Sequence, residues 1–482
     1  MKIGKNQYLL CPQGSKIMPS YASKLNMSHY DLFLGEDCEC TVVEYKGKEL
    51  SLIGYAINAD KPEQPQKTMC FELLSSINDD YSNIGDLTFF WGGRYVLVVS
   101  DGRSLVAMTD ACGMKSAFYQ DDILASQARY IAEYLGVKDD SAAIDYISKS
   151  MKRDKEYTWP LDRTKYKSVK RLLPNHIYKN GRIERFSVRN RYVEYSDDNR
   201  ANEAARLLQN SVKAAAKLKP LAITLTAGWD SRIVMAAALP DIKQYDFVTL
   251  QYSHIYDSHQ DIQVPKSLCA EYGANHHLLK SRKLNANFVN EYMNHSENGH
   301  KYWIQMIQSI RDYGYENHFW TKGSCNEISR NSSGILYNWQ VNARILSKLY
   351  GIFADSFSKC AIKEWLPGAK QYAKDSGYSV LELFYWEHRL GSWLAECLNE
   401  ADVVGDTFSP FNVRAYFEVI KGIEVKKRIS PFYTFFQNML TVCSMNTDIP
   451  INPNRYDSAI AKINCLVKNK LHLVYNILLL LK

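Results

Sequence analysis

The segment LAITLTAGWDSRIVMAAAL, residues 221–239, constrains this chain more than any other, because it joins a strand pattern to a helix pattern through a very short turn. Ala227 and Gly228 leave room in that turn for a ligand to approach the backbone. The free N–H groups at the start of a helix and the positive end of its dipole attract phosphate and other anions. The segment therefore predicts an anion site, although the same residues also fit an ordinary connection in which Asp230 or Ser231 only caps the helix.

The acid in this turn adds a more specific expectation. Thr226 and Ser231 offer hydroxyl donors at the rim of the turn. Asp230, in contrast, would repel a phosphate unless a divalent cation lay between them, and Mg²⁺ prefers carboxylate, water and phosphate oxygens as ligands. We therefore predict that Asp230 is a magnesium ligand.

The chain has 482 residues, a length that predicts two domains. The pattern of strand and helix signals changes near residue 195. Residues 1–195 contain short β segments such as FFWGGRYVLVVSDG and predict an antiparallel, strand-rich domain. The polar stretch RNRYVEYSDDNR marks the boundary, and Asp197, Asp198 or Asn199 can cap the helix that follows. In residues 196–482 strands and helices alternate before long helical stretches take over, which predicts a helix-covered parallel sheet with a helical C-terminal part.

Composition narrows the classes of function. The net charge of +7 is not gathered into a basic block, so nucleic acid is not an expected partner. The 11 cysteines are an odd number, and the start MKIGKNQYLLCPQG has no apolar stretch of secretory length, which favours a cytoplasmic protein. The ending KNKLHLVYNILLLLK is too short to cross a bilayer. It predicts a packed terminal helix or a homodimer contact, with a membrane-surface contact as the alternative.

Several motifs resemble those of the asparagine synthetase family, in its glutamine-hydrolysing, class B-like form. TAGWDSR resembles the family's SGGxDS pyrophosphate loop. DIQVPKSLCAEYGANHHLL resembles the segment that follows the family's second strand, with Asp261, His276 and His277 on matching positions. TKGSCNEIS occupies the place of the family's second loop, SGEGSDE, and FSPFNVRAYFEV that of its C-terminal Pro-Phe turn. The resemblance spans roughly Asp86 to Asn452.

The first half contributes to the same resemblance. MTDACGMKSAFYQDDILASQARYIAEYLG is similar to the family's RDxxGxKPLYY and SExxAL patterns, and RLLPNHIYKNGRIERF to its LPPGHxL segment. The implied fold combines α+β and α/β parts. A glutaminase-like (Ntn-type) antiparallel layered domain over 1–195 precedes an α/β ATP-pyrophosphatase-type (adenine nucleotide alpha hydrolase-like) domain over 196–482.

The resemblance also implies roles for individual residues. The expected ATP-binding residues are Leu225, Thr226, Ala227, Gly228, Trp229, Ser231, Leu250, Asp261 and Gly323. The expected magnesium ligands are Asp230 and Asn326, and the expected catalytic residues are Asp230 and Glu327. Cations that could reach the departing pyrophosphate are Arg389, Arg414, Lys426, Lys427 and Arg428.

The chain departs from the family's pattern at two places. Glutamine-hydrolysing members use a cysteine exposed as the mature N-terminus, whereas this sequence starts with Met1, and its nearest thiol, Cys11, is internal. The first domain is therefore expected to be a degenerate glutaminase with an inert Cys11. In TKGSCNEIS, Gly323 replaces the family's glutamate and Asn326 its aspartate, while Glu327 is unchanged.

The resemblance implies an ATP-dependent carbon–nitrogen ligase. It would activate a small carboxylate as an acyl-adenylate, release pyrophosphate and pass the acyl group to an amine donor, with ATP and Mg²⁺ as cofactors. Aspartate, as in asparagine biosynthesis, is the default acid. The alternatives are a lactam-forming or other specialised amide-forming enzyme and, because of Gly323 and Asn326, a non-catalytic nucleotide-binding relative. A tRNA-modifying enzyme with a similar loop would need paired cysteines and a basic face.

Overall fold

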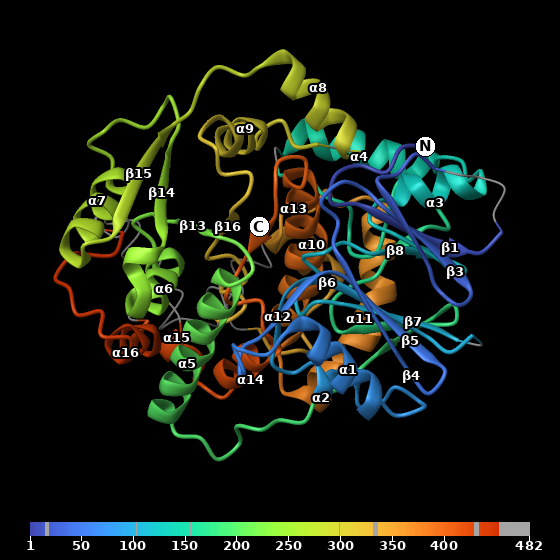
Figure 1. Ribbon diagram of the computed structural model, residues 1–482, viewed down its shortest axis with the longest axis horizontal. Helices are drawn as coiled ribbons and strands as arrows, with labels where there is room; N and C mark the ends of the chain where they lie inside the picture. Colours follow the sequence, from blue (N-terminus) through green and yellow to red (C-terminus); the bar gives the residue numbers. More distant parts are fainter. Residues whose placement is uncertain are drawn as a thin grey trace.

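The computed structural model of the protein describes residues 1–14, 19–102, 104–154, 156–297, 299–330, 336–428 and 433–452. The N-terminal part contains two antiparallel sheets, and the C-terminal part contains one parallel sheet and most of the helices (Figure 1). The mixed architecture expected from the sequence is confirmed at this level.

Two six-stranded antiparallel sheets make up the N-terminal part. In the first, the order β10-β8-β9-β1-β3-β2 joins strands β1 (Tyr8–Pro12), β2 (Ser23–Asn26), β3 (Tyr30–Leu34), β8 (Phe118–Gln120), β9 (Ile123–Ala125) and β10 (Lys170–Arg171). In the second, the order β12-β11-β7-β6-β5-β4 joins β4 (Cys40–Tyr45), β5 (Lys48–Asn58), β6 (Trp91–Ser100), β7 (Leu105–Thr109), β11 (His176–Lys179) and β12 (Arg182–Arg185). The helices of this part are α1 (Gln66–Ser76), α2 (Ile84–Leu87), α3 (Ala128–Leu135) and α4 (Ser141–Arg153).

The two antiparallel sheets pack face to face, because their strands alternate apolar side chains between two faces. In β6, Val96 and Val98 lie in the core between the sheets together with Leu10 of β1. Leu97 and Val99 of the same strand lie in the core beneath α1. A further core packs α3 against the outer face of the first sheet. The layers therefore run helix, sheet, sheet, helix, which is the antiparallel layered domain predicted from the sequence.

The C-terminal part is built on a five-stranded parallel sheet with the order β15-β14-β13-β16-β17. Its strands are β13 (Leu221–Thr224), β14 (Asp246–Gln251), β15 (Asn275–Lys280), β16 (Phe319–Thr321) and β17 (Thr407–Phe408). Helices cover both faces, since Leu221 and Ile223 of β13 pack in one core and Ala222 in another. The helices nearest the sheet in sequence are α5 (Asp197–Ala216), α6 (Trp229–Ala238), the 3₁₀ helix η1 (Leu239–Gln244), α7 (Gln260–Tyr272), α8 (Ala286–His295) and α9 (Ile304–Asp312).

Helices dominate the rest of the described chain. They are α10 (Ala343–Leu349), α11 (Ser356–Ser376), α12 (Val380–Phe384), the π-helix η2 (Tyr385–Leu394), α13 (Ala395–Ala401), α14 (Arg414–Lys421), α15 (Val425–Arg428) and α16 (Thr434–Val442). No helix among the described residues is long and apolar enough to cross a membrane. The C-terminal run KNKLHLVYNILLLLK, for which a packed helix, a subunit contact or a membrane-surface contact was expected, lies outside the described residues.

A polar stretch separates the two parts near the predicted boundary. The helix expected there is present as α5, but the residue that caps it is Ser196, whose hydroxyl accepts a hydrogen bond from the backbone N–H of Asn199. Asp197, Asp198 and Asn199 were the expected caps. The nearest of these, Asp197, lies one residue after the observed cap. Ser196 is the cap because its backbone is extended, as this position requires.

A buried ion pair joins the two parts. Arg94 of β6 donates to the carboxylate of Asp402, which follows α13, and to that of Asp406, with nitrogen–oxygen distances of 2.7 and 3.0 Å. Arg94 is 1% exposed and Asp402 is fully buried. Removing one partner of such a pair leaves an uncompensated buried charge, which costs about 3–5 kcal/mol. The antiparallel sheets are therefore held in a fixed position beside the strands that carry the candidate site.

Candidate functional site

The order in which strands are added to the parallel sheet reverses at β13, and a cavity lies at this point. From β13 the chain proceeds to β14 on one side, while β16 is added on the other side. In open α/β sheets, ligands bind outside the carboxyl ends of the strands where the order reverses in this way. The cavity there has a volume of about 420 Å³, which lies within the usual range for small-molecule sites. It is lined by the segments that follow β13, β14 and β16 and by residues of η2.

Side chains hold the loop after β13 in one conformation. The Ser231 hydroxyl lies 3.1 Å from both the backbone nitrogen and the hydroxyl oxygen of Thr226. The carboxylate of Asp261, at the start of α7, accepts a hydrogen bond from the backbone N–H of Ala227 at 2.9 Å. The N–H of Gly228 is directed at the Thr226 hydroxyl at 3.3 Å. The loop is therefore preorganised, and its own N–H groups already have partners.

The helix that starts at this edge of the sheet is α6. The helix begins at Trp229, and no side chain caps its first turn. Asp230 and Ser231, the residues expected as caps in the simpler interpretation, instead line the cavity. The uncapped N–H groups and the positive end of the helix dipole thus lie beside the cavity, an arrangement that favours an anionic group.

Both oxygens of the Asp230 carboxylate accept hydrogen bonds within the protein. One oxygen accepts from the side-chain amide of Asn326 at 2.8 Å, and the other from Arg330 at 2.7 Å. The amide oxygen of Asn326 accepts in turn from the hydroxyl of Tyr416 at 2.8 Å. Because a carboxylate only accepts, Asn326 must present its nitrogen to Asp230. The expected magnesium pair is therefore not assembled: Asn326 does not fit as a ligand, and Arg330 neutralises Asp230.

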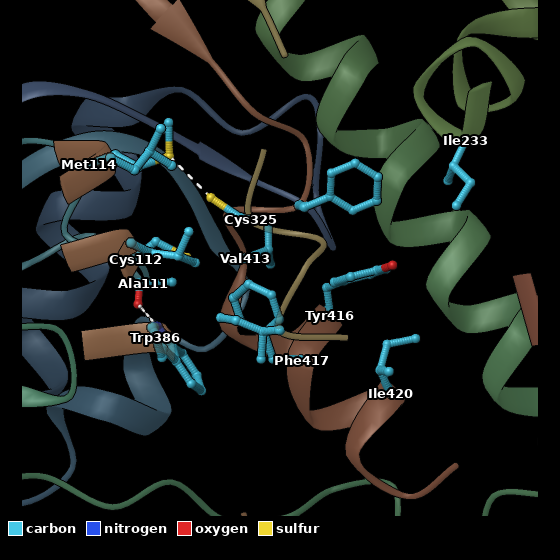
Figure 2. Packing of buried hydrophobic residues seen from close by; sticks show 14 of the residues in the cluster. Ala111, Cys112, Met114, Ile233, Cys325, Trp386, Val413, Tyr416, Phe417 and Ile420 are labelled. Carbon is cyan, nitrogen blue, oxygen red and sulfur yellow. Dashed lines mark hydrogen bonds between the residues drawn. The ribbon is translucent and has the colours of Figure 1, made fainter. Parts of the chain in front are cut away.

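The loop after β16 approaches the first loop too closely to accept a side chain at Gly323. A Cβ atom there would lie 2.8 Å from both the backbone carbon and the Cβ of Asp230. The loop also contacts the N-terminal part. The buried Cys325, with φ of 78°, directs its sulfur to that of Met114 at 3.6 Å (Figure 2). A glycine at position 323 is thus required by packing.

Glu327 brings a titratable group to the cavity. Burial, reinforced by the negative charge of Asp230, raises the pKa of Glu327 to about 7. Its Oε2 atom is buried and has no hydrogen-bond partner among the described residues. A carboxyl group whose pKa lies near neutral pH can take up and release a proton during a reaction. Glu327 is therefore suited to general acid–base catalysis.

The structure brings most of the predicted site residues together. Those that line the cavity are Leu225, Thr226, Asp230, Ser231, Leu250, Asp261, Gly323 and Glu327. Trp229 does not, because its ring packs against that of Tyr433 at 5.2 Å between centroids. Ala227 and Gly228 shape the loop without lining the cavity.

Other predicted residues lie elsewhere. The five cations proposed for pyrophosphate do not line the cavity, and each binds another residue: Arg389 binds Glu156, Arg414 binds Asn175, Lys426 binds Glu424, Lys427 binds Asp197 and Arg428 binds Glu382.

The histidines and the first cysteine also have structural contacts. His276 lies 2.9 Å from the hydroxyl of Thr249, and His277 lies 3.2 Å from a carboxylate oxygen of Asp246. Cys11 is buried in β1, and burial raises the pKa of its thiol. Burial therefore disfavours the reactive thiolate form of Cys11.

Several residues of the cavity were not predicted. Lys322 was part of the quoted motif TKGSCNEIS, but no role was assigned to it. Trp303, Tyr385 and Trp393 come from helices whose position relative to the sheet the sequence does not reveal. In TKGSCNEIS, Lys322 stands where the pattern SGEGSDE has a glycine. This added cation was the signal in the sequence for this part of the site.

The tight contact at Gly323 predicts the effect of a methyl group. We expect Gly323→Ala to lower the free energy of unfolding by about 1–3 kcal/mol, because the neighbouring backbone must shift. Gly368→Ala in α11 is the matched control, since a Cβ there meets no atom closer than 3.8 Å and alanine favours a helix. Urea unfolding followed by circular dichroism measures both variants. Equal stability of Gly323→Ala and the wild type would contradict the packing described here.

The chain was also compared with known proteins. No protein-family model matches it, and no curated protein does. Among the solved structures that match is glutamine phosphoribosylpyrophosphate amidotransferase from B. subtilis, complexed with ADP and GMP. It is 8% identical over 67% of this chain and 76% of that chain, with a TM-score of 0.23. Another, the allosteric regulatory enzyme of purine biosynthesis, is 10% identical over 73% of both chains, with a TM-score of 0.24. At such TM-scores neither structure carries an argument about this chain, and none of the comparisons shows membership of the asparagine synthetase family.

Proposed function

We propose that this chain is an ATP-dependent amide-forming enzyme, which activates a carboxylate as an acyl-adenylate and releases pyrophosphate. The observation that carries the proposal is the uncapped start of α6. It faces a cavity at the point where the strand order of the parallel sheet reverses. Such a site supplies an anion-binding end beside an apolar wall, which is what a nucleotide requires.

In this proposal the phosphates of ATP bind at the start of α6 and the base lies against Leu225, Val248 and Leu250, which form an apolar wall of the same cavity. A partly buried helix end contributes at most about 2 kcal/mol. Binding at 0.1 mM requires roughly 5.5 kcal/mol. Burial of the base and hydrogen bonds from Thr226 must therefore supply the remainder.

In the first chemical step, an oxygen of the substrate carboxylate attacks the α-phosphorus of ATP. A bond forms between these two atoms, and the bond from the α-phosphorus to the bridging oxygen breaks, so that pyrophosphate leaves with the electron pair. Positioning and charge neutralisation dominate such reactions. Arg330 pairs with Asp230 and so reduces the repulsion between the Asp230 carboxylate and the phosphates. Because Asp230 and Asn326 do not assemble a magnesium site, no step is assigned to a metal.

In the second step an amine attacks the acyl carbon, the bond to the AMP oxygen breaks, and an amide forms. The attacking nitrogen must lose a proton, and the Glu327 carboxylate lines the cavity where it can accept that proton. Glu327 would thus act as the general base. It would take the place of the glutamate that the similar family has where this chain has Gly323. Cys11 is buried, so the proposal assigns no glutamine hydrolysis to its thiol.

A non-catalytic nucleotide-binding protein is the second candidate. It is favoured by the loss of the family's acids at Gly323 and Asn326, because both positions serve packing in this chain. The two candidates differ in a simple measurement. A non-catalytic relative would bind ATP, seen as a rise in melting temperature, but would form no pyrophosphate with any carboxylic acid tested.

Asp230 tests the proposed first step. We expect Asp230→Asn to reduce pyrophosphate release about 100-fold, because Arg330 loses the charge that positions it and small displacements are costly in catalysis. Release is measured during a screen of carboxylic acids with ATP, and circular dichroism checks the fold. Asp241→Asn, in η1 beyond α6, is the control and should keep full activity. Wild-type release by Asp230→Asn would refute the role given to this residue.

The raised pKa of Glu327 predicts a pH profile for the second step. A general base acts in its ionised form, so at a fixed concentration of unprotonated amine the rate of amide formation should rise as pH increases through about 7 and then level off. Glu327→Gln should lose this dependence and most of the rate, yet retain exchange between ATP and pyrophosphate. An unchanged profile in Glu327→Gln would mean that another group takes the proton.

A further inference from the structure

The cavity also has an aromatic wall. We call the aromatic chamber the part lined by Trp303, Met306, Trp320, Leu390, Trp393 and Leu394. The rings of Trp303 and Trp393 meet edge to face, with 6.1 Å between their centroids. Because the two rings contact each other, they form a continuous apolar wall against which a further ring or another bulky apolar group can pack.

The π-helix η2 shapes this chamber. It spans Tyr385–Leu394, and Tyr385, Leu390 and Trp393 all line the cavity. A π-helix is rare and is frequently found at functional sites. Its wider turn brings side chains to the cavity that a regular α-helix would distribute around its axis.

One cation lies at the edge of the aromatic chamber. The ammonium group of Lys322 is 5.9 Å from the centre of the Trp303 ring. Among the described residues that line the cavity, Lys322 has the only cationic side chain, and no carboxylate in the described ranges forms an ion pair with it. Lys322 is half-buried, and the partial removal of its ammonium group from water lowers its pKa to about 8. An anionic ligand would restore the balance.

The acidic side chains of the same cavity do not neutralise the positive charge of Lys322. Asp230 is paired with Arg330, and Asp261 accepts from the backbone N–H of Ala227. Glu327 has a pKa raised to about 7. The titratable or charged groups that act on Lys322 are Cys397 of α13 and Arg94 of β6. Arg94 carries the same charge as Lys322, and burial raises the pKa of the Cys397 thiol.

We infer that the acid activated by this chain is a monocarboxylate with a bulky, ring-bearing apolar body, which occupies the aromatic chamber while Lys322 binds its carboxylate. The inference rests on the proposed function and names its substrate class. Aspartate fits this chamber poorly, because its second carboxylate and its ammonium group would lie against apolar rings without partners. The cavity offers Lys322 as a cation for one carboxylate.

Binding of 3-phenylpropanoate to the full chain without ATP tests the inference. Isothermal titration calorimetry gives the dissociation constant, and the fluorescence of Trp303 and Trp393 reports entry into the chamber. We expect 3-phenylpropanoate to bind at least 10-fold more tightly than aspartate or 3-phenylpropan-1-ol, which lacks the charge. Lys322→Met should weaken binding of the acid at least 10-fold and leave the alcohol unaffected, whereas Lys301→Met, at an exposed position, should change neither.

The pH dependence distinguishes a direct charge contact from a change in packing. Affinity of the wild type for 3-phenylpropanoate should fall as pH rises above about 8, because Lys322 then loses its proton. In Lys322→Arg the affinity should stay constant over this range. Equal binding of aspartate, or unchanged binding of 3-phenylpropanoate by Lys322→Met, would overturn the inference. So would a Lys322→Met variant that loses ATP binding and keeps acid binding, since Lys322 would then bind phosphate.

The failure of this inference differs from a failure of the proposed function. If 3-phenylpropanoate binds as expected but no carboxylic acid gives pyrophosphate with ATP, the adenylation proposal fails and the chamber assignment stands. If pyrophosphate forms with aspartate and not with ring-bearing acids, the chamber assignment fails and the adenylation proposal stands.

Discussion

The pairing of β13 with β14 on one side and β16 on the other is the constraint on which the candidate site depends. All three strands are parallel, so their carboxyl ends meet at one edge of the sheet. The loops that follow β13 and β16 are separated by many residues in the sequence, yet this pairing brings Gly323 against Asp230. Without it, the start of α6 and the Glu327 carboxyl would not share a cavity.

Contacts from the antiparallel sheets keep these loops in place. The ion pair of Arg94 with Asp402 joins β6 to the segment before β17, and Met114 lies against Cys325 (Figure 2). The N-terminal part thus serves as a rigid support for the cavity.

The sequence predicted the parts of the site that depend on local patterns. The hydrophobic run, small turn and helix pattern at residues 221–239 predicted the loop and α6, and the short β segments of residues 1–195 predicted the antiparallel sheets. The orientation of Asn326 could not be predicted, because it is set by Tyr416, a residue 90 positions away. The pairing of Asp230 with Arg330 is likewise a tertiary contact. The chamber around Lys322 depends on where α9 and η2 pack, which periodicity does not determine.

The central claim is that the carboxylate attacks the α-phosphorus of ATP at this edge of the sheet. The most direct test is to supply a carboxylic acid labelled with a heavy oxygen isotope in its carboxylate and to analyse the nucleotide product by mass spectrometry. Adenylation followed by amide formation leaves one labelled oxygen in AMP. Formation of ADP with the label in inorganic phosphate, or of AMP without label, would contradict the claim.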